Sequence, residues 1–331
     1  MQLLATTPGL FPLPDDAKEV LSDLKGHQRG DMIDGDEDEE VVAVYEDVRE
    51  ELVEIQRDAG LDRIVEGQAR WDDMLAHPLV VHDNVETGGI VRYYDNNNFY
   101  RDPLVQGELT FDGDMAADLE AAASLTDGLQ AVAPGPYSLA DLATDEYYED
   151  EPTFLDAVAN FLAGEIDAFP DAVETVFLLE PSLVSSPPGE GADERASEAI
   201  DRVADAIDVP VVVQTYWGAL EETVHAHLLD ADVDAVGYDL VSAHEANATL
   251  LAEYGTKDDV ALGVVDGQNT LVEDPETIVE RVEWIDQQTP PAQDFDTVYV
   301  TSSTELFYLP TNRFEEKLNA LATAAERGVD R

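Results

Sequence analysis

The strongest constraint on the fold is a repeated alternation of short, continuous apolar runs with segments of helical spacing. The runs are apolar throughout rather than at every second residue, which is typical of strands covered on both faces. Eight such runs are present, at residues 3–7, 63–67, 129–135, 175–181, 209–216, 234–240, 260–267 and 297–303. The chain therefore predicts a sheet of eight buried strands.

Helical patterns lie between these runs. Residues 41–60 place apolar side chains near helical spacing and end on Gly60, which can close a helix. The other segments of this kind are 152–169, 196–207, 220–229, 275–288 and 311–328. Strands that alternate with helices run parallel and are joined by right-handed crossovers. Eight strands in a chain of 331 residues predict an α/β fold, a (β/α)8 TIM barrel that forms one domain over residues 1–331.

Two segments interrupt the alternation. Residues 89–111 contain the aromatic and turn-rich stretch RYYDNNNFY, which predicts an inserted β-hairpin, because asparagine tolerates the left-handed backbone angles of a turn. Residues 185–194 read SSPPGEGADE and predict a mobile loop.

The charge balance limits the possible partners. The chain has 74 acidic residues against 17 Lys and Arg, for a formal charge of −57. Phosphate groups are bound by clustered cations, so this balance excludes nucleic acid and an anionic membrane as partners. No apolar run reaches the ~18 residues of a membrane-spanning helix, and the first residues carry no cationic leader. We therefore expect a cytoplasmic protein.

The acidity does not indicate disorder. The chain is 44% hydrophobic and 8% aromatic, whereas disordered acidic segments lack such residues. A folded core under an acidic surface is strongly self-repelling in dilute buffer. At about 1 M salt the Debye length falls to ~3 Å, which screens this repulsion. The composition therefore predicts a halophilic protein from a salt-rich cytoplasm.

Polar residues follow the predicted strands at the end where the active face of a barrel lies. We predict that they line a pocket, with the alternative that the carboxylates only cap helices and hold loops. No catalytic residue and no set of metal ligands can be assigned within this group. The predicted pocket-lining residues are Glu180, Gln214, Tyr216, Trp217, Asp239, Asp266, Asn269, Ser302 and Ser303.

Short motifs recur at these strand ends. In chain order they are RYYDNNNFYRDP at 92–103, PGPYSL at 134–139, EPSL at 180–183, TYW at 215–217, YDLV at 238–241, LGVVDGQN at 262–269 and SSTELFYLP at 302–310. Together they resemble the cobalamin-independent methionine synthase family, whose members consist of two similar barrels. The chain is most similar to the N-terminal barrel, which carries no zinc. The resemblance covers nearly the whole chain.

The resemblance implies a function in methionine synthesis, of the 5-methyltetrahydropteroylpolyglutamate–homocysteine S-methyltransferase type. In the family, zinc in the C-terminal barrel is held by a His-x-Cys pair and a second Cys. Gln214, Tyr216 and Thr304 occupy those positions here, and the chain has no cysteine at all. We therefore expect no cofactor on this chain, zinc on a separate partner barrel, and a methyl-tetrahydrofolate-type co-substrate.

The hairpin supplies a second group of candidates, for docking of the partner or for stacking of a pterin ring. The alternative for each is core packing. This group consists of Tyr93, Tyr94, Asp95, Asn97, Phe99 and Tyr100. Two other functions remain open: a non-catalytic protein that regulates or stabilises the zinc barrel, and a zinc-independent methyltransferase or decarboxylase of the same superfamily.

The acidic composition generates a prediction about salt. We expect the far-UV circular dichroism signal of the folded chain to be lost when salt is removed by dialysis, because unscreened carboxylates repel one another. Returning the salt should restore the signal. A spectrum unchanged in dilute buffer would contradict the predicted adaptation.

Overall fold

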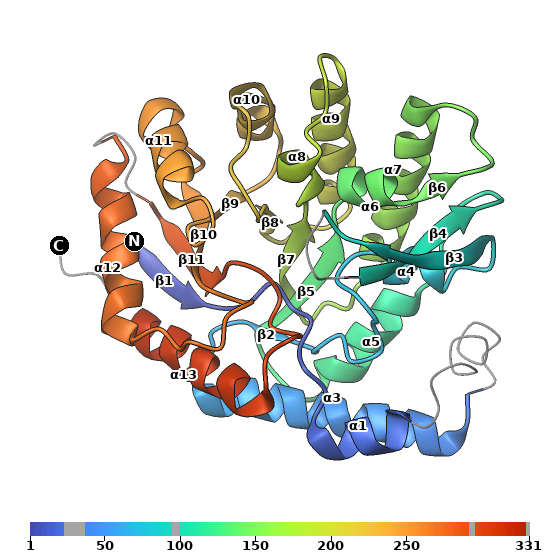
Figure 1. The fold of residues 1–331 in the computed structure, drawn as a ribbon, viewed down its shortest axis with the longest axis horizontal. Helices are drawn as coiled ribbons and strands as arrows, with labels where there is room; N and C mark the ends of the chain where they lie inside the picture. The colour runs from blue at the N-terminus through green and yellow to red at the C-terminus, as the bar shows by residue number, and fades with distance from the viewer. Residues whose placement is uncertain (23–36, 95–98, 291–294, 329–331) are drawn as a thin grey trace.

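The computed structural model describes residues 1–22, 37–94, 99–290 and 295–328 (Figure 1). Its main element is an eight-stranded sheet in which every neighbouring pair is parallel. In sheet order the strands are β1 (Gln2–Ala5), β11 (Thr297–Ser302), β10 (Asp259–Val265), β9 (Ala235–Asp239), β8 (Val211–Gln214), β7 (Val173–Leu179), β5 (Leu129–Pro134) and β2 (Ile64–Val65). All eight predicted strands are therefore present, although β2 is shorter than expected.

The sheet curls, so that its two edge strands approach each other. The backbone N–H groups of Asp62 and Arg63, just before β2, donate to the carbonyl oxygen of Ala5 in β1 at 3.0 and 3.3 Å. The Ala5 N–H in turn donates to the Asp62 carboxylate at 2.8 Å. The fold is therefore TIM-barrel-like.

Helices surround the curled sheet, and the strands face an apolar interior (Figure 1). The longer helices are α3 (Glu39–Ala59), α5 (Asp114–Ala123), α7 (Glu151–Asp167), α9 (Ala192–Ala204), α10 (Glu222–Asp230), α11 (His244–Tyr254), α12 (Pro275–Gln288) and α13 (Thr311–Arg327). The shorter ones are α1 (Asp15–Ser22), α4 (His77–Val80), α6 (Pro136–Leu142) and α8 (Ser182–Ser185). None of the described helices is both long and apolar enough to cross a membrane.

The helix ends follow from local sequence. The Asp38 carboxylate accepts from the Glu40 N–H at the start of α3, and Gly60 closes the helix at φ +86°. Asp150 caps α7 by accepting from Thr153. α9 begins at Ala192, inside the segment predicted as a mobile loop, so residues 192–194 of that prediction are wrong. Two of the longer helices, α5 and α11, were not predicted.

The inserted hairpin is confirmed, with different limits. β3 (Val85–Arg92) pairs antiparallel with β4 (Phe99–Val105), and β6 (Thr144–Asp145) adds to β4 in parallel. The hairpin therefore begins before residue 89 and ends before residue 111. β3 is one of the two edge strands of this small sheet, and one extra residue between Thr87 and Ile90 shifts its register. The predicted turn at residues 96–98 lies outside the described residues.

Gly67 allows the chain to leave β2 next to α3, and this generates a prediction about stability. Its φ is +105°, and a Cβ there would lie 2.6 Å from Leu52 Cδ1. We expect Gly67→Ala to lower the free energy of unfolding by about 1–3 kcal/mol through backbone strain and overpacking. Chemical denaturation in high salt measures the change.

Gly89→Ala is the matched control, because a Cβ at this exposed position meets no atom within 4 Å. Equal stability of the two variants would contradict the tight approach of Gly67 to α3.

Candidate functional site

Glu180 lies directly after β7 and is fully buried. Its carboxylate accepts hydrogen bonds from the Tyr137 N–H at 2.9 Å, the Ser138 N–H at 2.8 Å and the Ser138 hydroxyl at 2.7 Å. A Cβ on Gly135 would lie 2.2 Å from this carboxylate, so only glycine fits there. Burial raises the pKa of Glu180 to about 7, despite the hydrogen bonds from Ser138. Glu180 thus anchors the start of α6 to the end of β7.

Asp239, at the end of β9, has a similar arrangement. Its carboxylate accepts from the backbone N–H groups of Trp217, Val241 and Ser242 at 2.8–2.9 Å, and from the Ser242 hydroxyl. Trp217 has a φ of +70°, a strained angle for a residue with a side chain. Asp239 holds this strained turn in place, which agrees with the loop-holding alternative.

Asp266 and Asn269 form turns after β10. Asp266 Oδ1 accepts from the Gln268 N–H, and Asn269 Oδ1 accepts from the Leu271 N–H, both at 2.9 Å. Asp266 is half-buried and Asn269 is exposed. Both side chains are more exposed than that of Glu180.

The remaining predicted strand-end residues are buried. Gln214 donates to the Thr215 carbonyl at 3.0 Å, and the Tyr216 hydroxyl donates to Met74 Sδ at 3.0 Å. Ser302 Oγ donates to the carbonyl of Thr304, two residues along the chain. Ser303 is buried as well and accepts from the Gly267 N–H at 3.5 Å. These contacts bring Gln214, Tyr216, Ser302 and Ser303 into the interior at the C-terminal end of the sheet.

The hairpin and the end of β8 meet in one aromatic cluster, which we define as Tyr93, Tyr94, Tyr100, Tyr216 and Trp217. Ring centroids are 4.4 Å apart for Tyr93 and Tyr100, 5.6 Å for Tyr93 and Tyr94, 5.1 Å for Tyr94 and Trp217, and 4.8 Å for Tyr216 and Trp217. The hairpin therefore packs its aromatic side chains against the polar strand ends.

Phe99 is the exposed member of the predicted hairpin residues. Its side chain is 45% exposed, and the Arg92 guanidinium lies 5.7 Å from its ring centroid. Asp95 and Asn97, the two polar residues predicted with it, lie outside the described residues.

A network of buried charges near β2 was not predicted. The Arg49 guanidinium lies 2.5 Å from the Asp118 carboxylate and 3.9 Å from that of Glu66. Burial, together with the nearby Asp118 charge, raises the pKa of Glu66 to about 8. Because these residues lie on different helices and strands, no local sequence pattern connects them.

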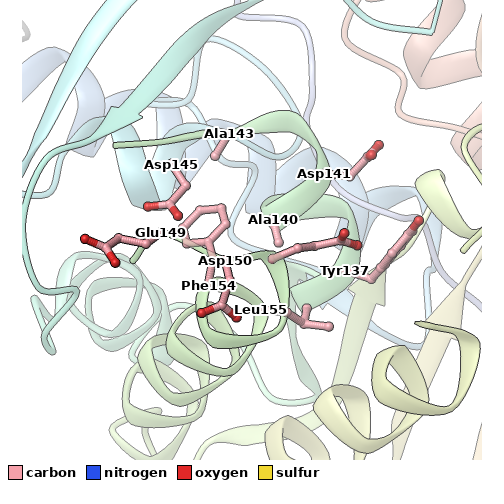
Figure 2. A pocket seen from close by; sticks show the side chains of 10 residues that line it. Tyr137, Ala140, Asp141, Ala143, Asp145, Glu149, Asp150, Phe154 and Leu155 are labelled. Atoms are coloured by element: carbon pink, nitrogen blue, oxygen red, sulfur yellow. The ribbon is translucent and has the colours of Figure 1, made fainter. Parts of the chain in front are cut away.

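A second unpredicted feature is a cavity of about 330 Å³ beside α6 (Figure 2). In Figure 2 the Phe154 ring lies between Asp145 and Glu149 on one side and Tyr137 on the other. The lining residues are Tyr137, Ala140, Asp141, Ala143, Asp145, Glu149, Asp150, Glu151, Phe154 and Leu155. Five of these ten lining residues are Asp or Glu, and the others are Ala, Tyr, Phe or Leu.

Asp141 connects this cavity to the hairpin. Its Oδ2 accepts from the Ser182 hydroxyl at 2.8 Å, and the Tyr94 hydroxyl lies 2.5 Å from the same Ser182 Oγ. A hydrogen-bonded chain therefore runs from the cavity to the aromatic cluster.

Zinc does not fit the positions where the family holds it. The described ranges contain no cluster of three or more His, Cys, Asp or Glu suited to a metal ion. Gln214, Tyr216 and Thr304 offer an amide, a phenol and a hydroxyl in place of imidazole and thiolates. Burial raises the pKa of Tyr216 well above its usual value, so the phenol stays neutral.

The parallel sheet, its outer helices and its polar strand ends define a TIM-barrel-like α/β protein. The sequence pattern of the cobalamin-independent synthase N-terminal domain matches residues 82–290. The chain therefore belongs to the cobalamin-independent methionine synthase family, through its N-terminal domain.

Individual relatives agree with this assignment. The chain is 25% identical to a methionine synthase of Saccharolobus solfataricus, over 88% of this chain and 86% of that protein. It is 30% identical to a 5-methyltetrahydropteroyltriglutamate–homocysteine methyltransferase of Salinibacter ruber, over 69% of this chain and 30% of the longer protein. A B12-independent methionine synthase from a Shewanella species, solved with selenomethionine, shares the fold with a TM-score of 0.79 at 18% identity, covering 99% of this chain and 98% of its own.

Glu66 generates a prediction about pH. Its pKa is about 8 in the folded chain against an ordinary 4.5, so the folded state holds a proton that the unfolded state releases. The free energy of unfolding should therefore fall as pH rises from about 4.5 to 8. Glu66→Gln keeps the side chain neutral, and we expect a shallower decline in denaturation curves.

Glu174→Gln is the control, because the Glu174 side chain is 50% exposed and pairs with Arg63 at 3.2 Å. Identical pH slopes for the Glu66 variant and the unmodified chain would show that Glu66 does not hold this proton.

Proposed function

We propose that the chain acts in methionine synthesis as the non-zinc half of a 5-methyltetrahydropteroylpolyglutamate–homocysteine S-methyltransferase. It would work with a separate chain that carries the zinc-bearing barrel. The observation that carries this proposal is the chemistry of Gln214, Tyr216 and Thr304 at the family's zinc positions.

These three side chains are committed to internal contacts. Gln214 donates to Thr215, Tyr216 to Met74, and Thr304 Oγ1 to the Glu305 carbonyl at 3.3 Å. When bound to the partner, zinc would favour the thiolate form of homocysteine, whereas an amide, a phenol and a hydroxyl stand at the corresponding positions of this chain. The chain's own contribution is then to shape and close the substrate cleft.

The hairpin offers a surface for the partner. In the hairpin, the side chain of Ile90 is 69% exposed and that of Phe99 45%. Tyr308, between β11 and α13, is 49% exposed and forms a hydrogen bond with the backbone of Phe99. Exposed apolar side chains of this kind favour protein association. Arg92, beside Phe99, is one of few cations on a strongly acidic chain. An anionic folate tail would therefore depend on cations of the partner for much of its binding.

We also propose that the curled sheet is a complete (β/α)8 barrel that forms one domain. The hydrogen bonds from Asp62 and Arg63 to Ala5 support closure between the edge strands. We also assign the protein to a salt-rich cytoplasm, which its charge of −57 supports. Of the segment 185–194 that we predicted as a mobile loop, residues 186–191, between α8 and α9, remain a proposal.

A second candidate is an enzyme of the same family that acts without a partner. Its support is that the archaeal methionine synthases match over most of their own length, 86% for Saccharolobus solfataricus and 89% for Sulfolobus acidocaldarius. Those proteins are therefore close to this chain in size.

Methyl transfer with and without the zinc barrel tests the proposal. In high salt, we expect the chain to co-purify with a cysteine-containing relative encoded beside it. Transfer of the methyl group to homocysteine should need both chains. Activity of this chain alone would establish the second candidate, and unchanged activity of the zinc chain without it would refute the proposal.

Phe99→Asp should weaken the association at least tenfold, because it places a charge on the proposed contact surface. Phe111→Asp is the matched control, since Phe111 is 57% exposed but lies outside strands β3 and β4. Equal effects of the two substitutions would contradict docking through the hairpin.

A further inference from the structure

The cavity beside α6 has no part in the proposed function. Residues of α6, of β6 and of the start of α7 line it (Figure 2). Its volume of about 330 Å³ reaches the lower end of the range of small-molecule pockets, roughly 300–1,000 Å³. Its floor belongs to the core, since Phe154 is 4% exposed and Leu155 7%. Asp141 and Glu149, by contrast, are exposed, so the cavity is open to solvent on their side.

The cavity has carboxylates at two ends and apolar groups between them. In Figure 2, Asp145 and Glu149 lie at one end, and Asp141 lies at the other. Glu151 belongs to the second end, because its charge acts on the Asp141 carboxylate. The Phe154 ring lies between the two ends. This distribution is complementary to a linear molecule that has a cation at each end and an apolar chain in the middle.

A carboxylate at each end is held in place and keeps free acceptor capacity. Asp145 Oδ1 accepts from the backbone N–H groups two and three residues further along the chain, at 2.9 and 2.8 Å. Asp141 accepts one hydroxyl on each oxygen, from Ser182 at 2.8 Å and from Ser186 at 3.2 Å. Because an ionised carboxylate has about four acceptor positions, both groups can accept further hydrogen bonds from a ligand.

The described part of the protein supplies no cation to these carboxylates. No described Lys, Arg or His forms an ion pair with an acidic residue of the cavity. Glu149 and Glu151 also form no hydrogen bond with a described residue. Burial, together with the nearby Glu151 charge, raises the pKa of Asp141. A cation bound at this end would lower that pKa again, so the cation and the ionised carboxylates stabilise each other.

The walls of the cavity favour an organic cation over a metal ion. The described ranges contain no group of three or more His, Cys, Asp or Glu placed to hold a metal ion. The middle of the cavity offers an alkyl wall at Ala140 and Leu155 and an aromatic ring at Phe154. Apolar walls accept the alkyl part of an amine, and aromatic rings attract its ammonium group.

We propose that the cavity beside α6 binds a linear aliphatic diamine. One ammonium group contacts Asp145 and Glu149, and the other contacts Asp141 and Glu151. The alkyl chain lies against the Phe154 ring. This site is independent of the proposed function, because it uses neither the strand ends of the eight-stranded sheet nor the exposed side chains of the hairpin.

Calorimetry on the full chain in high salt, without any partner, tests the site. The probes are putrescine and hexamethylenediamine, each compared with the monoamine of equal chain length, butylamine or hexylamine. We expect at least one diamine to bind at least about tenfold more tightly than its monoamine, because the second ammonium group forms charge-assisted hydrogen bonds. Monoamines that bind as tightly as the diamines, or no binding of any probe, would overturn the proposal.

Ala140→Leu separates the cavity from general attraction to the acidic surface, because it fills the space without changing the charge. We expect at least about tenfold weaker binding of the diamine, since a leucine side chain occupies the place of its alkyl chain. Ala252→Leu, at an exposed position of α11, is the matched control and should leave binding unchanged. Undiminished binding by a folded Ala140 variant would overturn the proposal.

Glu149→Gln tests the charge at one end of the cavity and keeps the result interpretable if Ala140→Leu does not fold by circular dichroism. We expect at least about tenfold weaker binding of the diamine. Glu146→Gln is its matched control, because Glu146 is exposed, accepts from Gln106 at 3.1 Å and does not line the cavity. Equal effects of the two substitutions would show non-specific attraction and overturn the site.

Discussion

The structure depends on one geometric constraint, that all eight strands of the sheet run in the same direction. Their C-terminal ends consequently meet at one edge, and each chain segment leaving a strand must turn there within a crowded space. The turns expose backbone N–H groups that need acceptors. Glu180 and Asp239 supply them, each accepting several hydrogen bonds from a neighbouring segment. These two carboxylates lie at the C-terminal ends of the strands, where the active site of a barrel is expected, and they hold neighbouring chain segments together by hydrogen bonds.

The sequence was sufficient for the strands and for most of the outer helices, because burial on both faces leaves an unbroken apolar run. α5 and α11 escaped prediction for a local reason. Half of the residues of α5 are alanine, so the helix has no clear apolar face. In α11 the apolar residues alternate irregularly with polar ones, so no helical periodicity is visible. β2 was predicted too long because Glu66 and Gly67, the last residues of the run, belong to the segment that leads from β2 to α4.

The site was predictable only in part. Glu180, Asp239 and Tyr216 were predicted as site residues because each follows a predicted strand. The contacts of each side chain, however, are made with a segment far away in the sequence. Tyr93 and Asp73 are 20 residues apart and on different elements, so neither suggests the other. The ion pair of Arg49 with Asp118 is likewise a product of helix packing. Contacts between segments far apart in the chain produce no periodic pattern in the sequence, so they cannot be predicted from it.

The register shift in β3 has a consequence for colloidal behaviour. β3 is an edge strand whose backbone groups could pair with the same strand of another molecule. Electrostatic repulsion normally keeps acidic proteins apart, but concentrated salt removes it at distances beyond a few ångströms. The extra residue between Thr87 and Ile90 bends the edge and interrupts its row of donors and acceptors. The shape of the β3 backbone therefore hinders edge-to-edge association between molecules. Unlike charge repulsion, this effect does not depend on the salt concentration.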